Sequence, residues 1–305
     1  MLWRRSIVLM LTAWLAMLAP VRAEDEPSVG GKKLSEWINL LQNGDTLQKR
    51  QAGLAALQLI GPRKSRKVTP ALIAALRENT QEIIRAGASS ALGRIARGAR
   101  AEDDTPIDKI CDALAAALRA DKQPRVRKAA AHALGTMDKG RAIHGVDALA
   151  LALKDKDAAT RTEAARALSL IGKDADMARA DLQSALQDAK MERLMRIHCA
   201  SALGHIGAAA STPALKAVLG DVKNDSELRR ACANALAELG KDGAEAAPTL
   251  AAVLSAKQSD VALRRAAVEA LDSMGEEARP ALTALRHALK DDDQFVRARS
   301  LHTIG

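Results

Sequence analysis

The 305-residue chain contains three Trp, one Phe and no Tyr, so aromatic residues make up only 1% of it. Strands favour aromatic and β-branched residues, whereas the Ala, Leu, Arg, Lys and Glu that dominate here favour helices, so the composition excludes a predominantly β protein. The formal net charge of +9 is uneven: after residue 23, the surplus lies entirely before Leu151, where 21 Lys and Arg face 15 Asp and Glu.

The N-terminus has the three parts of a secretory signal. Arg4 and Arg5 precede an apolar run over residues 7–18, and small side chains occupy the −3 and −1 positions at Val21 and Ala23. This pattern predicts a signal peptide over residues 1–23, cleaved before Glu24. Because a membrane helix needs about 20 apolar residues, a retained anchor is the weaker alternative. We therefore expect export to the periplasm, cell envelope or extracellular space, a linker over residues 24–32 and a repeat domain over residues 33–305.

One phrase, Ala-Leu followed by an apolar residue three positions on, recurs through that domain. The repeated Leu residues are 35, 42, 34, 35, 33 and 35 positions apart. An Arg stands seven positions before each Leu, and an eighth Arg continues the register. The repeated Leu residues are Leu57, Leu92, Leu134, Leu168, Leu203, Leu236 and Leu271; the Arg column is Arg50, Arg85, Arg127, Arg161, Arg196, Arg229, Arg264 and Arg297.

Each Arg marks a predicted second helix of a repeat. Counted from the Arg, apolar or small residues fall at −1, +3, +6, +7 and +10, which is one stripe of an α-helix. A Gly after the stripe predicts a left-handed C-cap, and an acidic residue four positions before the Arg predicts the helix start. These acidic residues are Asp157, Glu192, Asp225, Asp260 and Asp293.

A first helix is predicted upstream of each second helix, often with Pro in its first turn. These prolines are Pro70, Pro213, Pro248 and Pro280, and the first helices are expected to end near Leu41, Leu76, Leu118, Leu153, Leu186, Leu219, Leu254 and Leu289. The longest step is expected to hold its extra residues in a polar loop over residues 97–105. The pattern predicts an all-α, right-handed α-solenoid of about eight helical-hairpin repeats.

The phrase Asp-x-x-(Val/Leu)-Arg-x-x-Ala-x-x-Ala-Leu-x-x-Ile-Gly resembles HEAT repeats, specifically the short HEAT-like repeats of phycobiliprotein lyases. The resemblance covers Lys33 to Gly305. It implies that the Arg column is structural and that the second helices line the concave face. A HEAT-like enzyme, deoxyhypusine hydroxylase, uses His-Glu pairs as iron ligands, but no His in this chain is followed by Glu.

Candidate chemistry is otherwise sparse. His198 and His205 share a helix face but are expected to lie about 10 Å apart along the axis, too far to share one metal ion. Cys199 and Cys232 occupy equivalent positions of stacked helices, expected about 8–10 Å apart, so we expect buried thiols together with Cys111, not a disulfide. The sequence has no nucleotide-binding loop, nucleophile elbow or zinc motif. We predict no catalytic residue, cofactor or metal.

Binding has more support than catalysis. The +1, +5 and +9 positions should face the concave side, and they include the candidate binding residues Arg94, Lys128, His132, Arg166, His205 and Arg230. A basic loop is predicted at Arg63, Lys64, Arg66 and Lys67, either as a binding element or as a solvated loop.

Three classes of function follow from these residues. We favour an exported scaffold or adaptor for other proteins, whose partner could be an acidic protein. An anionic polymer bound by the basic half is the alternative, and an enzyme related to bilin lyases or HEAT-like hydroxylases is the third. Export and the near absence of stacking aromatics disfavour nucleic acid as a partner.

Overall fold

The computed structural model describes residues 26–61, 65–99, 105–137, 140, 143–256 and 259–305. The predicted signal peptide, Arg63 and Lys64 of the predicted basic loop, and residues 100–104 of the predicted insertion lie outside these ranges.

Helical hairpins follow one another along the described chain, and each pairs a first helix with a second. Their bounds are α2 Leu34–Asn43 and α3 Leu47–Ile60; α4 Ser65–Glu78 and α5 Glu82–Gly98; α6 Ile107–Ala120 and α7 Pro124–Gly135; α8 Val146–Ala152 and α9 Ala158–Ile171; α10 Arg179–Gln187 and α11 Arg193–Ile206; α12 Thr212–Gly220 and α13 Ser226–Leu239; α14 Ala247–Ser255 and α15 Val261–Met274; α16 Leu282–Ala288 and α17 Gln294–Ile304. Short 3₁₀ helices precede five of the first helices: η2 Ile143–Gly145, η3 Gly172–Ala178, η4 Ala209–Ser211, η5 Gly240–Ala246 and η6 Gly275–Ala281.

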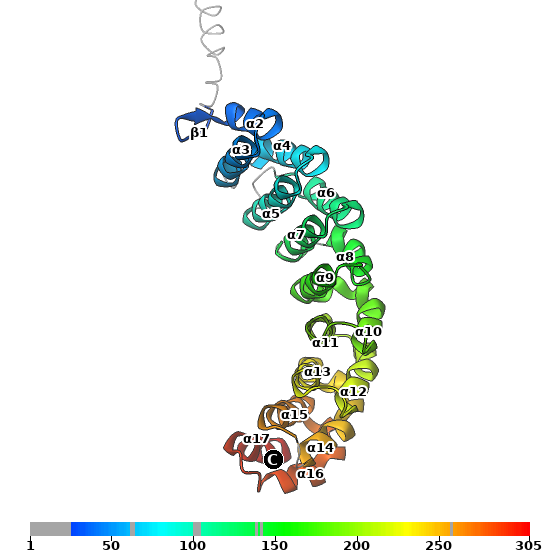
Figure 1. Ribbon diagram of the computed structural model, residues 1–305. Coiled ribbons are helices and arrows are strands. Elements are labelled where there is room, and N and C mark those ends of the chain that lie inside the picture. Colours follow the sequence, from blue (N-terminus) through cyan, green and yellow to red (C-terminus); the bar gives the residue numbers. More distant parts are fainter. Residues whose placement is uncertain (1–25, 62–64, 100–104, 138–139, 141–142, 257–258) are drawn as a thin grey trace, which may run out of the picture.

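The hairpins stack into a curved solenoid of two layers (Figure 1). The second helices, α3 to α17 in odd numbers, line the concave side, and the first helices form the convex side. This arrangement confirms the predicted all-α solenoid. Within the described ranges, none of the helices combines the length and the apolar character needed to cross a membrane.

A small β-hairpin occupies part of the predicted linker, residues 24–32, and extends to Lys33. Strands β1 Ser28–Val29 and β2 Lys32–Lys33 pair antiparallel around Gly30 and Gly31, whose φ angles of 57° and 78° suit glycine. The indole Nε1 of Trp37 in α2 donates to the Val29 carbonyl at 3.0 Å. The hairpin is thereby attached to the first repeat.

The predicted helix starts are confirmed at all five acidic residues, and four of them cap the helix through their side chains. Asp157, Asp225, Asp260 and Asp293 each accept a hydrogen bond from a backbone N–H in the first turn of their helix. Glu192 is also the residue before its helix, but its carboxylate makes no cap and instead contacts Arg161 of the preceding repeat.

The predicted helix ends need corrections at glycine. Only Gly207 adopts the left-handed cap conformation, with φ 74° and ψ 24°. Gly172, Gly240 and Gly275 have positive φ with ψ near −129°, because the chain turns there directly into a 3₁₀ helix. Gly61 remains right-handed, with φ −49°.

The predicted role of proline is also wrong at Pro70 and at Pro280, which lies in the 3₁₀ helix η6 before α16 begins at Leu282. Pro70 lies inside α4, which begins five residues earlier at Ser65. Arg66 and Lys67 therefore occupy the first turn of a helix and are exposed there, whereas we had placed them in a loop. Pro213 and Pro248 stand in the first turn of their helices as predicted.

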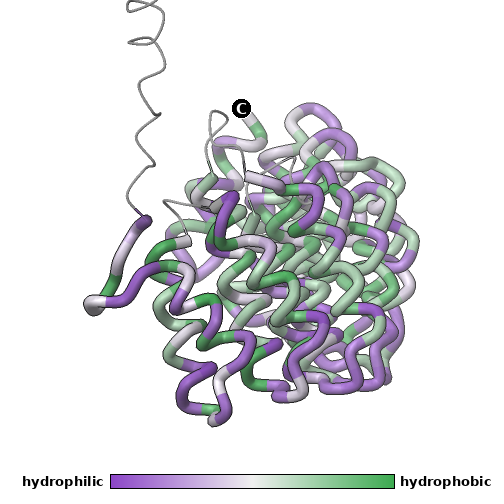
Figure 2. The backbone as a smooth tube through the Cα atoms, turned by 90° about the horizontal axis from the view of Figure 1, so that it is seen from above, coloured by the Kyte–Doolittle hydropathy of each residue, from purple (hydrophilic) through white to green (hydrophobic). Residues whose placement is uncertain are grey.

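The buried stripe of the second helices forms a continuous core with the first helices. The repeated Leu is fully buried in each of the seven repeats, and hydrophobic and hydrophilic residues alternate along the helices as expected for one buried face (Figure 2).

Consecutive second helices approach each other closely through small residues. A Cβ on Gly93 would lie 2.7 Å from the Ala133 Cβ, and one on Gly135 would lie 2.5 Å from that of Ala167. Because second helices pack more closely than first helices do, the stack curves toward the second-helix side.

Candidate binding surface

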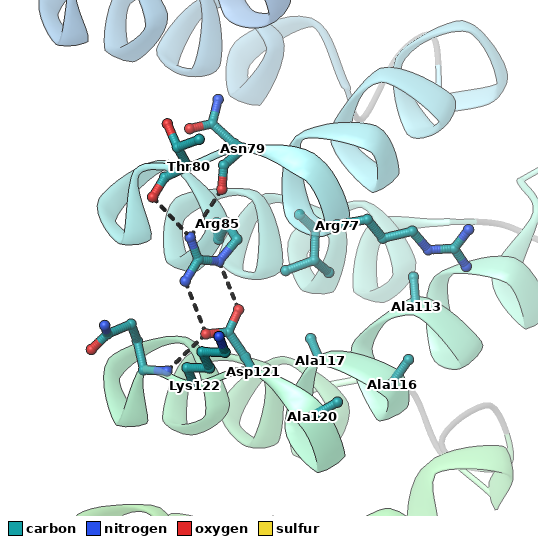
Figure 3. A pocket seen from close by; sticks show the side chains of 12 residues that line it. Arg77, Asn79, Thr80, Arg85, Ala113, Ala116, Ala117, Ala120, Asp121 and Lys122 are labelled. Atoms are coloured by element: carbon teal, nitrogen blue, oxygen red, sulfur yellow. Dashed lines mark hydrogen bonds and ion pairs between the residues drawn. The ribbon is translucent and has the colours of Figure 1, made fainter.

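Arg85 shows how a member of the Arg column can bond both its own repeat and the next one (Figure 3). Its Nη1 donates to the carbonyls of Asn79 and Thr80 at 2.9 and 3.2 Å, in the loop before its own helix. Its Nε and Nη2 donate to the two carboxylate oxygens of Asp121 in the following repeat, at 2.7 and 2.9 Å. The hydrogen bond with Asp121 raises the pKa of Arg85, although burial opposes the shift.

The same bidentate pair recurs at other steps of the stack. Arg127 donates to both oxygens of Asp155 at 2.7 Å, and Arg264 donates to both oxygens of Asp291 at 2.8 and 3.0 Å. At these positions each arginine donates to carbonyls in the loop of its own repeat, and a carboxylate of the next repeat neutralises its charge. The predicted structural role of the column is therefore confirmed for these residues.

Three steps of the column lack this carboxylate, and at the first of them Arg50 donates through Nε to the Gly44 carbonyl of its own repeat at 2.7 Å. Arg196 donates through Nε to the Leu186 carbonyl, and Arg229 donates to the Leu219 carbonyl, both at 2.8 Å. In the described part of the chain, none of the three has a bonded carboxylate.

A polar cluster on the concave side joins α7 to α9. The Nδ1 of His132 lies 2.9 Å from the Glu163 Oε1 and 2.7 Å from the Arg166 Nη2, and Arg166 also donates to Glu163 through Nε at 3.0 Å. A neutral His132 can accept from Arg166 at that nitrogen, whereas a protonated His132 donates to Glu163. Burial opposes ionisation of Glu163, but Arg166 and His132 outweigh it and lower its pKa.

A second cluster joins α9, α11 and α13. The Nδ1 of His205 lies 2.7 Å from the Ser169 carbonyl and 3.1 Å from the Ser169 hydroxyl, and its Nε2 lies 3.5 Å from the Glu238 Oε1. Burial raises the pKa of Glu238, and His205 opposes that shift.

Ser169, His205 and Glu238 are the residue types of a hydrolytic triad, but their geometry differs from one. The imidazole nitrogen near the Ser169 hydroxyl also faces a backbone carbonyl, to which it donates its proton, so it cannot act as a base toward that hydroxyl. The hydroxyl is buried inside helix α9, whose backbone N–H groups are bonded within the helix. This cluster fixes side chains between repeats and offers no nucleophile.

The structure places all six predicted concave residues on second helices. Arg94 lies on α5, Lys128 and His132 on α7, Arg166 on α9, His205 on α11 and Arg230 on α13. Arg166 is half-buried and the other five are exposed. Only His132 and Arg166 are brought together, through Glu163.

Several members of these clusters were missed by the sequence analysis. Glu163, Ser169 and Glu238 stand at +2, +8 and +9 of their repeats, on the face opposite the buried stripe. Those register positions could have identified them as concave. Their partners come from other repeats, 31 to 36 residues away, so the contacts require the stack.

Metal and thiol chemistry has no visible site. In the described ranges, no group of three or more His, Cys, Asp or Glu side chains is arranged to hold a metal ion. Cys111, Cys199 and Cys232 are buried and form no disulfide, as predicted. Burial raises the pKa of Cys111 to about 11 and that of Cys199 and Cys232 to about 12, so their thiols are protonated at neutral pH.

Stacked hairpins with a repeated interlocking arginine define this chain as an α-solenoid repeat protein. The family of HEAT repeats matches residues 107–191, 146–237 and 222–305, so the chain belongs to the HEAT-repeat family. The finer resemblance to phycobiliprotein lyases stays a prediction. Among curated proteins, a search finds no significant match.

Solved structures with similar folds include importin β and a bacterial protein. Importin β matches with 14% identity and a TM-score of 0.62, over 88% of this chain and 40% of that chain. YibA of Escherichia coli matches with 20% identity and a TM-score of 0.55, over 88% of this chain and 91% of that chain. Human deoxyhypusine hydroxylase matches with 18% identity over 89% of this chain and 95% of that chain, but a TM-score of 0.37 supports no inference about chemistry.

Proposed function

We propose that this protein is an exported, non-catalytic scaffold that binds other proteins through its concave face. The observation that carries the proposal is the difference between the two faces of the second helices. Their buried stripe and Arg column build the stack, whereas the opposite face presents exposed charged and polar side chains, only some of which bond between repeats. HEAT solenoids of similar fold include the karyopherin Kap121p, whose structure was solved bound to Pho4p.

A crosslinking experiment tests the concave face directly. A photo-reactive amino acid replaces the exposed Asn234 on α13, and the control replaces the exposed Thr283 on the convex helix α16. After irradiation in envelope extracts of the source organism, we expect adducts with defined proteins from position 234 and not from 283. Equal labelling from both positions, or none from either, would contradict a concave binding face.

Export is a separate part of the proposal and has its own test. The N-terminal pattern of two arginines, an apolar run and small residues at the exit supports cleavage after Ala23. N-terminal sequencing of the protein from its source organism is expected to begin at Glu24. A protein that retains Met1 and stays in the cytosol would refute export and leave the scaffold proposal to the crosslinking experiment.

A further inference from the structure

Positive charge in the first three repeats is concentrated on the concave layer. The concave helices α3, α5 and α7 together carry eight Lys and Arg and one acidic residue, Glu82. The convex helices α2, α4 and α6 of the same repeats carry five Lys and Arg and four acidic residues. The charge surplus of the N-terminal half is thus located on one face.

Half of these concave cations are already used by the fold. Lys49 pairs with Asp45, Arg50 donates to the Gly44 carbonyl, and Arg85 and Arg127 belong to the Arg column. The other four, Arg94, Arg97, Arg125 and Lys128, are exposed and bond to no carboxylate of the described residues. They stand at +9, +12, −2 and +1 of their repeats, opposite the buried stripe, so they surround the concave surface of these three repeats.

A trough lies on this surface across α3, α5 and α7. It has a volume of about 410 Å³, and much of its lining consists of small side chains: Ala55, Ala86, Gly87, Ser90 and Ala129. Its apolar floor includes Leu54 and Ile83. At Gly87 a Cβ would lie 2.4 Å from the Leu54 Cδ2, so glycine keeps both the helix packing and the trough open there.

Polar groups in the lining can bond to a peptide backbone. Gln51 and Gln58 are half-buried in α3, and Arg125 stands at the end of the trough on α7. The amide of Gln58 makes one long bond, 3.4 Å to the Gly87 carbonyl, and its side-chain oxygen can still accept. Amide side chains, small residues and an apolar floor together suit an extended polypeptide.

We propose that this trough binds an extended, acidic segment of a protein partner, an inference that rests on the proposed scaffold function. Carboxylates of the segment pair with Arg94, Arg125 and Lys128, its backbone bonds to the Gln side chains, and its small or apolar residues contact Leu54 and Ile83. A polymer that carries only charge would use the cations and leave the apolar floor and the amides without a partner.

Fluorescence anisotropy with defined probes tests the charge requirement. The probe is a labelled peptide in which Glu alternates with Ala and Leu, and the comparison peptide has Lys in place of Glu. The triple variant R94Q/R125Q/K128Q is expected to bind the acidic peptide about tenfold more weakly, since exposed charge pairs contribute modestly one by one. The control K67Q/R77Q/K109Q removes the same charge from the convex layer and is expected to change the affinity less than about twofold.

A steric variant separates a peptide from a polyanion. Ala55→Trp fills the trough without a charge change, and Ala116→Trp on the convex helix α6 is its control. The trough variant is expected to lose the acidic peptide while it keeps its affinity for heparin. The proposal is wrong, and the surface is a general polyanion site, in either of two cases. In the first, Ala55→Trp keeps its affinity for both the peptide and heparin. In the second, heparin displaces the peptide equally from the parent and from every variant.

Failure of this inference differs from failure of the scaffold proposal. Adducts from Asn234 without binding of the acidic peptide would leave the concave scaffold intact and overturn the trough. An equal loss of affinity for the acidic peptide in the convex and concave charge variants would also overturn the proposed trough. Circular dichroism of each variant establishes that it is folded before its affinity is measured.

Discussion

The pair between Arg127 and Asp155 provides a strong test of the Arg column. Arg127 is 4% exposed, and its guanidinium donates twice to Asp155, which also accepts from the Asp157 N–H at 2.8 Å. After Asp155→Asn, the side-chain oxygen can still accept from the Asp157 N–H. The negative charge is lost, and so is one of the two oxygens that accept from Arg127. Breaking a buried ion pair typically costs 3–5 kcal/mol, and because Asn keeps one acceptor we expect about 3 kcal/mol.

The loss of stability should be localised at one step of the stack. Contacts run between neighbouring repeats, so weakening the step between α7 and α9 is expected to separate the first three repeats from the rest. Chemical denaturation followed by circular dichroism should then show two transitions where the parent shows one. Lys154→Ala removes the exposed pair between Lys154 and Asp181, which also joins neighbouring repeats, and should cost less than about 1 kcal/mol.

A double-mutant cycle isolates the pair itself. Arg127→Met and Asp155→Asn together should cost less than the sum of the single changes, because the double variant leaves no buried charge unpaired. The reasoning is refuted if Asp155→Asn unfolds within about 0.5 kcal/mol of the parent or costs no more than Lys154→Ala.

Three further outcomes are expected. The three cysteines should react slowly with a thiol reagent in the native protein, and alkylation in denaturant without reductant should add three labels by intact mass; a single label would reveal a disulfide. Gly204→Leu should lower the unfolding free energy by about 1–3 kcal/mol, because its Cβ would lie 2.9 Å from the Ala235 Cα, whereas Gly98→Ala, with open space, should change it little. Although burial opposes ionisation, arginine lowers the pKa of Asp121 and Asp291, so their stabilisation should be complete above about pH 4 and be lost as the pH falls through the lowered values; a flat acid titration by circular dichroism would contradict this.

The second helices could be predicted because their signals repeat in every hairpin. The buried stripe, the acidic start and the Arg stand at fixed spacings, and a helix places such positions on fixed faces. The first helices have fewer signals. Proline suits a first turn but is tolerated within a helix at a cost, so Pro70 did not mark where α4 begins. The short hairpin before α2 has too few residues to show an alternating pattern.

The candidate surface could be predicted only in part. Register alone placed Arg94 and Lys128 on the concave side, because a helix position opposite the buried stripe must face away from the core. Register could not show which concave charges are neutralised, since a partner such as Glu163 or Glu238 reaches across to another repeat. That information lies in the stacking distance between helices, which no single repeat contains.

The positions that build the stack differ from those on the concave face, and this difference connects the fold with its proposed function. Positions that the stack requires hold similar residues: a buried Leu and an Arg recur along the chain, and an acidic residue precedes each second helix from α9 onward. The concave positions are not uniform, because from α9 onward several charges are paired with one another, as in Arg166 with Glu163 and Arg299 with Asp272. In the first three repeats Arg94, Arg97, Arg125 and Lys128 bond to no carboxylate of the described residues, and Arg125 lines a trough of small residues. Stacking alone gives no reason for this difference, whereas an acidic partner segment would supply the missing carboxylates.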